Sequence, residues 1–133
     1  MMMTIVESFW LRLHAVLSVF AEKLAAVHPA LVRELGRTAN DAFLLRGYLA
    51  FKRGADGDEL SITVDIQSDG QQITITSDAC TDDGRVVAAG PSAAIRSSSE
   101  RSVELALDEW LHEFEQFLLK NESAVAEAVS QLV

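Results

Sequence analysis

Apolar side chains recur every three or four residues at both ends of the chain, which is the period of an amphipathic helix. The spacing predicts one helix over about 4–27 and a second, longer helix over about 98–132. The main apolar stripe of the first helix is formed by Val6, Phe9, Trp10, Leu13, Val16, Leu17, Phe20, Leu24 and Val27. Leu11 and Val19 lie outside that stripe. We therefore expect the first helix to touch something on a second side, either as a central packing element or in a dimer.

The period changes from 3.6 to 2 in the middle of the chain. Apolar residues alternate with polar ones over 59–68 and 71–80, which predicts two strands that each bury one face. The Asp-Gly pair at 69–70 is a strong signal for a two-residue hairpin turn. Segments over about 42–53 and 85–90 complete a predicted set of four strands. The short loops between these strands favour an antiparallel meander.

Two shorter segments connect the predicted helices and strands. Residues 29–35 are predicted as a short helix, because Pro29 suits a first helical position and Gly36 suits the residue just past the end. The small-residue stretch 91–99 is predicted as a loop. The pattern as a whole indicates a single α+β domain over 1–133. It has two layers, a four-stranded antiparallel meander with the N-terminal and C-terminal helices packed on one sheet face.

Composition and charge narrow the classes of partner. The chain has 133 residues, of which 49% are hydrophobic, and a formal net charge of −9. This acidity disfavours nucleic acid and anionic membrane surfaces, which both need clustered Lys and Arg. The sequence shows no signal peptide and no uninterrupted apolar run of about 18 residues, so the expected location is the cytoplasm. The single cysteine, Cys80, cannot form an intramolecular disulfide and fits a reducing compartment.

The stretch EWLHEFEQF at 109–117 places Glu109 and His112 at a spacing that metal-binding helical bundles use. A bundle site needs two such pairs that project inward, whereas this chain has one pair outside the apolar stripe of its helix. Asp108, His112 and Glu115 have a spacing that could chelate a metal at the surface. A solvated acidic face explains them better, because spacing alone is weak support for a metal. We therefore predict no metal site.

Carboxylates are concentrated on the C-terminal helix, where residues 98–133 contain eight acidic and two basic side chains. This excess favours a basic or amphipathic surface of another protein as the partner, with plain solvation as the alternative. The candidate acidic face comprises Glu104, Asp108, Glu109, His112, Glu113 and Glu115. A second candidate is the polar outer face of the sheet, which includes Thr63, Asp65, Thr74 and Thr76. That face either meets solvent, receives a partner or pairs with a second copy.

Signatures of catalysis are missing from the sequence. It has no phosphate-binding glycine loop, no G-x-S-x-G elbow, no CxxC and no HExxH. None of the three histidines has a plausible nucleophile beside it from which a catalytic triad could be assembled. We therefore predict a protein without catalytic residues and without a cofactor.

Three functions are carried forward in order. The first is a small acidic protein-binding module of an adaptor, immunity or chaperone-like kind, with a homodimer left open. The second is a small-molecule or lipid-binding domain, with a cavity between helices and sheet lined by Phe9, Trp10, Phe20, Trp110 and Phe114. The third is an enzyme without a recognisable motif. In size, acidity and layout the chain resembles small bacterial partner-binding proteins such as toxin-immunity proteins and type III secretion chaperones, and no residue is carried over from either group.

Overall fold

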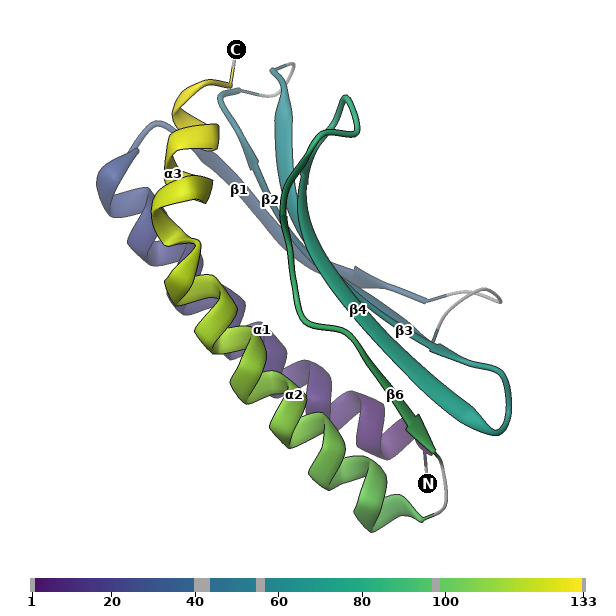
Figure 1. Cartoon of the computed structure of the whole chain (residues 1–133). Helices are drawn as coiled ribbons and strands as arrows, with labels where there is room; N and C mark the ends of the chain where they lie inside the picture. Colours follow the sequence, from purple (N-terminus) through teal and green to yellow (C-terminus); the bar gives the residue numbers. More distant parts are fainter. Residues whose placement is uncertain (1, 40–43, 55–56, 97–98, 133) are drawn as a thin grey trace.

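The computed structural model describes residues 2–39, 44–54, 57–96 and 99–132. These residues form two layers, a curved antiparallel sheet and helices that lie on one of its faces, while the other face is open (Figure 1). In chain order the elements are α1 (Met2–Val27), β1 (Val32–Thr38), β2 (Leu45–Lys52), β3 (Glu59–Ser68), β4 (Gln72–Thr81), β5 (Val86–Ala89), β6 (Ala93–Arg96), α2 (Glu100–Lys120) and α3 (Glu122–Ser130). The predicted α+β class, with helices on one sheet face, is confirmed.

The sheet has more strands than the predicted four. Its strands follow the chain order from β1 to β5, and β6 also pairs with β4. β5 pairs with β4 around residues 78–80 and β6 pairs with it at 72–75, so both lie along one edge. The ranges predicted for β3, β4 and β5 agree with the structure to within about one residue, as expected from their clear alternation. The predicted start of β2 at 42 lies outside the described residues.

The short helix predicted over 29–35 is wrong, because Val32–Thr38 form the edge strand β1, paired antiparallel with β2. Pairing with a neighbouring strand outweighs the local helix signals of Pro29 and Gly36. Gly36 instead lies opposite Tyr48 in the sheet. A Cβ at Gly36 would come within 2.7 Å of the Tyr48 hydroxyl, so this glycine makes room for a cross-strand neighbour.

Two ion pairs join β1 to α1. Arg33 Nη1 donates to Glu22 Oε1 at 2.9 Å, and Arg37 Nη1 donates to Glu7 Oε1 at 2.7 Å. The Arg37 guanidinium also lies 5.7 Å from the centroid of the Trp10 ring. Charged side chains on an edge strand hinder pairing with further strands. They also explain why β1 shows no apolar alternation in the sequence.

The additional strand determines the relative direction of α1 and α2. Because β5 and β6 share one edge, the chain crosses the sheet five times between these two helices. An odd number of antiparallel crossings makes the two helices parallel, whereas the predicted four crossings would have made them antiparallel. Ion pairs agree with the parallel arrangement, since Arg12 pairs with Asp108 on α2 and Lys23, further along α1, pairs with Glu122 at the start of α3.

One hydrophobic core fills the space between the helices and the inner sheet face. Trp110 stacks on Phe114 with ring centroids 5.0 Å apart, and Phe9 lies 6.0 Å from the same indole. Gly47 on β2 allows α1 to approach the sheet, because a Cβ there would lie 2.8 Å from the Trp10 ring. Three of the aromatic residues that were expected to line a cavity thus pack on one another.

α1 is apolar along much of its length. Over Thr4–Val27 its mean hydropathy is 1.3. By length and composition alone, this segment is long and apolar enough to span a membrane. In this fold Phe9, Leu13 and Leu17 are fully buried in the core. Packing on the sheet therefore accounts for these apolar residues.

The carbonyl of Pro91 ties the sheet edge to α2 at the kink between β5 and β6. It accepts hydrogen bonds from Ser77 Oγ at 2.9 Å and from Trp110 Nε1 at 3.1 Å. The Gly90 N–H donates to the Ser77 carbonyl at 3.0 Å. These bonds satisfy the polar groups that the kink removes from the regular sheet ladder.

Two further predictions need correction. The segment 91–99, predicted as a loop, contains the strand Ala93–Arg96, in which only Ile95 is buried. A strand of this length with one buried side chain shows no recognisable alternation. The helix predicted over 98–132 is divided into α2 and α3 at Asn121.

The predicted hairpin at 69–70 is present. Gly70 has a φ of 95°, which glycine adopts without strain. Asp69 Oδ1 accepts hydrogen bonds from the backbone N–H groups of Gln71 at 3.0 Å and Gln72 at 2.8 Å. These bonds favour the charged carboxylate and hold the pKa of Asp69 below its ordinary value.

We expect Asp69→Ala to lower the melting temperature at pH 7. A carboxyl whose pKa is depressed in the folded state stabilises the fold above its unfolded pKa of about 3.9, and this contribution is lost as the pH falls through the folded pKa. The difference between variant and wild type should therefore shrink at low pH. Thermal unfolding followed by circular dichroism at pH 7 and pH 2 measures it, and an equal loss at both pH values would contradict a role for the charged carboxylate.

Candidate functional site

Large apolar side chains are exposed on the outward face of the helix layer. On α1, Leu11 is 68% exposed and Val19 is 59% exposed, and on α2 Leu105 is 50% and Leu119 is 55% exposed. Apolar residues gathered on one face commonly mark an interaction site. The second side that Leu11 and Val19 predict for α1 is therefore an open surface, and α1 is not a central packing element among the described residues.

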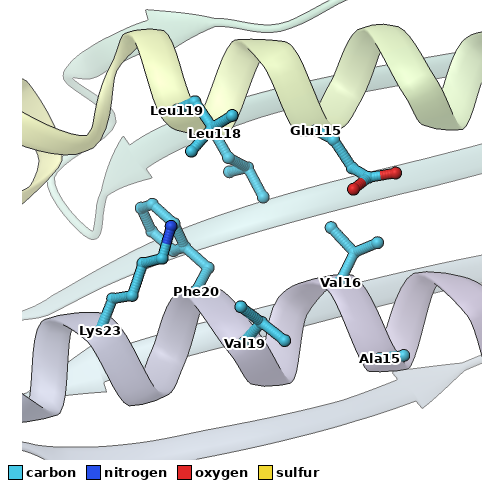
Figure 2. A pocket seen from close by; sticks show the side chains of 8 residues that line it. All are labelled: Ala15, Val16, Val19, Phe20, Lys23, Glu115, Leu118 and Leu119. Carbon is cyan, nitrogen blue, oxygen red and sulfur yellow. The ribbon is translucent and has the colours of Figure 1, made fainter.

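An apolar groove of about 370 Å³ lies between α1 and α2 on this face (Figure 2). Val16, Phe20 and Leu118 point into the gap between the two helices, while Val19 and Leu119 stand closer to solvent. The full lining is Ala15, Val16, Val19, Phe20, Lys23, Glu115, Leu118 and Leu119. Ala15 and Val16 are short, which leaves the outer side of the helix contact unfilled.

Ion pairs from α1 to α2 and to α3 lie beyond both ends of the apolar lining. Arg12 pairs with Asp108 on one side, and Lys23 Nζ lies 3.7 Å from Glu122 Oε1 on the other. The Glu115 carboxylate lies between them and extends into the groove (Figure 2). Within the part of the chain that the structure describes, no ion pair or hydrogen bond involves Glu115.

All six residues of the predicted acidic face are exposed, namely Glu104, Asp108, Glu109, His112, Glu113 and Glu115. They border different hollows. Glu104 and Asp108 border a polar hollow of about 420 Å³ between α1 and α2, and Glu115 borders the apolar groove. His112 and Glu113 line a different hollow of about 410 Å³, on the flank of α2 that faces β5. Asp108 and His112 are one helical turn apart, as are Glu109 and Glu113, so the acidic face extends round the exposed side of α2.

The surface arrangement gives no support to a metal site at these residues. Among the described residues, no group of three or more His, Cys, Asp or Glu side chains is placed to hold a metal ion. Asp108 pairs with Arg12, while His112 and Glu115 border different hollows.

The predicted polar sheet face lies on the open side of the sheet, where Thr63, Asp65, Thr74 and Thr76 are half-buried or exposed. Arg46 donates to both oxygens of Asp65, at 2.7 and 3.1 Å, and this hydrogen bonding raises the pKa of Arg46. A polar hollow of about 280 Å³ lies beside this pair. The Arg46 side chain in this hollow is already paired with Asp65, so its charge is neutralised within the protein.

Cys80 lies on the same open sheet face. Partial burial raises the pKa of its thiol, and the negative charge of Asp78 raises it further. A thiol with a raised pKa stays protonated at neutral pH, and the thiolate is the reactive form.

Sequence reasoning identified only part of the groove. Leu118 is 4% exposed and belongs to the core, and Val16 packs against the core, while both also line the groove. Leu119 was not singled out, although it lies beside the apolar stripe of its helix as Val19 lies beside that of α1. Apolar residues next to, but outside, a main stripe on both helices are the signal that indicates this second apolar surface.

Comparisons with known protein families, with curated proteins and with solved structures found no significant match.

Proposed function

We propose that this protein is a non-enzymatic protein-binding module, and that it holds a basic or amphipathic segment of a partner protein in the groove between α1 and α2. The observation that carries the proposal is the exposed apolar groove, whose Glu115 carboxylate has no ion-pair or hydrogen-bond partner among the described residues. Val19 and Leu119 supply apolar area, and Glu115 supplies charge.

Apolar contact supplies the favourable free energy of this binding. Complete burial of a valine or leucine side chain stabilises by about 1.5–3 kcal/mol relative to full exposure. Val19 and Leu119 are each more than half exposed, so each can contribute roughly 1 kcal/mol when a partner covers it. The floor residues Val16, Phe20 and Leu118 add contacts that a flat surface lacks.

Charge selects the kind of partner. The chain carries a net charge of −9, so a second copy would approach with the same sign, whereas a segment rich in Lys or Arg would be attracted. The same acidity is unfavourable for nucleic acid and for anionic membranes. We therefore favour a protein partner and, given a single cysteine, a reducing location such as the cytoplasm.

The small-molecule alternative has less support. It required a cavity between the helices and the sheet. Phe9, Trp110 and Phe114 pack on one another in that space. The apolar groove lined by Val16, Phe20 and Leu118 opens instead on the outer side of the helices.

We expect Val19→Glu to abolish capture of the partner. The tagged protein is purified under mild conditions from cells of its source, and bound proteins are identified by mass spectrometry. A carboxylate at the groove rim removes apolar contact and adds a second negative charge opposite Glu115. Because Val19 is 59% exposed, we expect the fold to tolerate the change. Leu105→Glu is the matched control, since Leu105 is similarly exposed but lies outside the groove lining.

The proposal is supported when one protein is retained at a fixed ratio by wild type and Leu105→Glu but lost from Val19→Glu. Equal retention by all three forms would place the partner elsewhere and contradict the groove. Light scattering of the purified wild type is a second test of the proposed protein partner. A wild-type dimer that Val19→Glu converts to a monomer would identify a second copy of the chain as the occupant.

A further inference from the structure

Three carboxylates occur at intervals of seven residues along the side of α2 and α3 that faces α1. They are Asp108, Glu115 and Glu122. Seven residues are about two helical turns, so the three side chains lie on nearly the same face, about 10 Å apart. The outer two are each neutralised by a cation from α1, through Arg12 and Lys23.

The middle carboxylate, Glu115, lies opposite apolar residues of α1, whereas Asp108 and Glu122 each lie opposite a cation of α1. The groove wall of α1 opposite Glu115 presents Val16 and Val19. Glu115 takes part in no ion pair within the described segments of the chain. Of the three carboxylates, Glu115 is therefore the one left for a cation from outside.

The two outer ion pairs also limit the length of the site. From Arg12 to Lys23 the axis of α1 rises by about 16 Å, which is roughly three turns. A helix three turns long presents its side chains at i, i+4 and i+7 to one surface. The available length thus fits three contacts from a single helical face.

Along the groove Glu115 lies beside Val16, while Val19 and Leu119 both lie further towards Lys23 (Figure 2). Resting on the proposed function, we propose that the segment bound in the groove is a helix of about three turns with a basic–apolar–apolar pattern at i, i+4 and i+7. The Lys or Arg at i pairs with Glu115, and its aliphatic stem lies along Val16. The two apolar side chains cover Val19 and Leu119. The partner then supplies the cation that α1 does not supply to the middle carboxylate.

Three synthetic peptides of about 16 residues test this pattern in one helical host of Ala and Gln, since shorter isolated helices are marginal. They carry Lys–Leu–Leu, Leu–Leu–Leu or Glu–Leu–Leu at i, i+4 and i+7. Binding to the wild type is measured by fluorescence anisotropy. We expect Lys–Leu–Leu to bind about three- to tenfold more tightly than Glu–Leu–Leu, the ratio that a partly exposed charge pair supplies.

Charge reversal at Glu115 tests the basic contact separately from binding in the groove. Glu115→Lys should invert the order of the Lys and Glu peptides, and Glu115→Gln should remove the preference. Glu113→Lys makes the same charge change on the opposite flank and should leave the order unchanged. If Val19→Glu weakens all three peptides while Glu115→Lys fails to invert the order, the groove stands and the basic contact is wrong. If no peptide binds the wild type more tightly than it binds Val19→Glu, both proposals are wrong.

Discussion

Replacing Trp110 by alanine should lower the free energy of unfolding by about 3–5 kcal/mol, as expected when a large buried aromatic side chain is truncated. The indole is 2% exposed and stacks on Phe114, with Phe9 on another side. Its N–H also donates to the carbonyl of Pro91, which ties α2 to the kinked sheet edge. Truncation therefore leaves a cavity between the layers and removes one of the two donors to that carbonyl. Urea unfolding followed by circular dichroism measures the loss.

Two further variants separate the contributions to that loss. Trp110→Phe keeps an aromatic ring but no N–H, so its loss should be smaller than that of Trp110→Ala. Leu105→Ala is the control on the same helix and should change the stability by no more than about 0.5 kcal/mol, because Leu105 is half exposed. Equal losses for Trp110→Ala and Leu105→Ala would show that the indole is not central to the core.

Gly47→Ala should be the second most damaging of these substitutions, with a loss of about 1–3 kcal/mol from overpacking. The added Cβ would lie 2.8 Å from Trp10 Cζ3 and 3.0 Å from Leu13 Cδ2. Both atoms belong to α1 and are buried, so the whole helix must move away from β2 to relieve the contact. The same urea titration measures this change.

Gly36→Ala is the matched control for Gly47→Ala. Its Cβ would meet the far end of the Tyr48 side chain, at 2.7 Å from the hydroxyl. Tyr48 is only half-buried on the open sheet face and can turn outward. Alanine also reduces the entropy of the unfolded chain, which offsets part of any strain. We expect a change near zero, and a loss as large as that of Gly47→Ala would contradict the view that the helix contact sets the cost.

The sequence predicts the fold best where a strand is buried on one face. β3 and β4 alternate cleanly because one side packs on the helices and the other meets solvent. β1 was missed because it is an edge strand whose inward residues Arg33 and Arg37 pair with α1 rather than enter the core. That one error also changes the direction of α2, since it changes an odd number of crossings to an even one.

The candidate site was harder to predict than the fold. Leu11 and Val19 indicate a second apolar side on α1, but periodicity cannot say whether that side is covered. The Asp108, Glu115 and Glu122 spacing is visible in the sequence. Which of these carboxylates is neutralised depends on the parallel packing of α1 and α2, which follows only from the complete topology.

The groove between α1 and α2 is tested most directly by a titration of the nitrogen-15-labelled protein with the Lys–Leu–Leu peptide, followed by two-dimensional NMR of its backbone amides. Binding in the groove predicts that the largest shift changes lie at Val16, Val19 and Leu119, and that they are absent in Val19→Glu. Changes confined to the open sheet face, around Thr63 and Thr76, with α1 and α2 unaffected, would contradict the groove as the binding site.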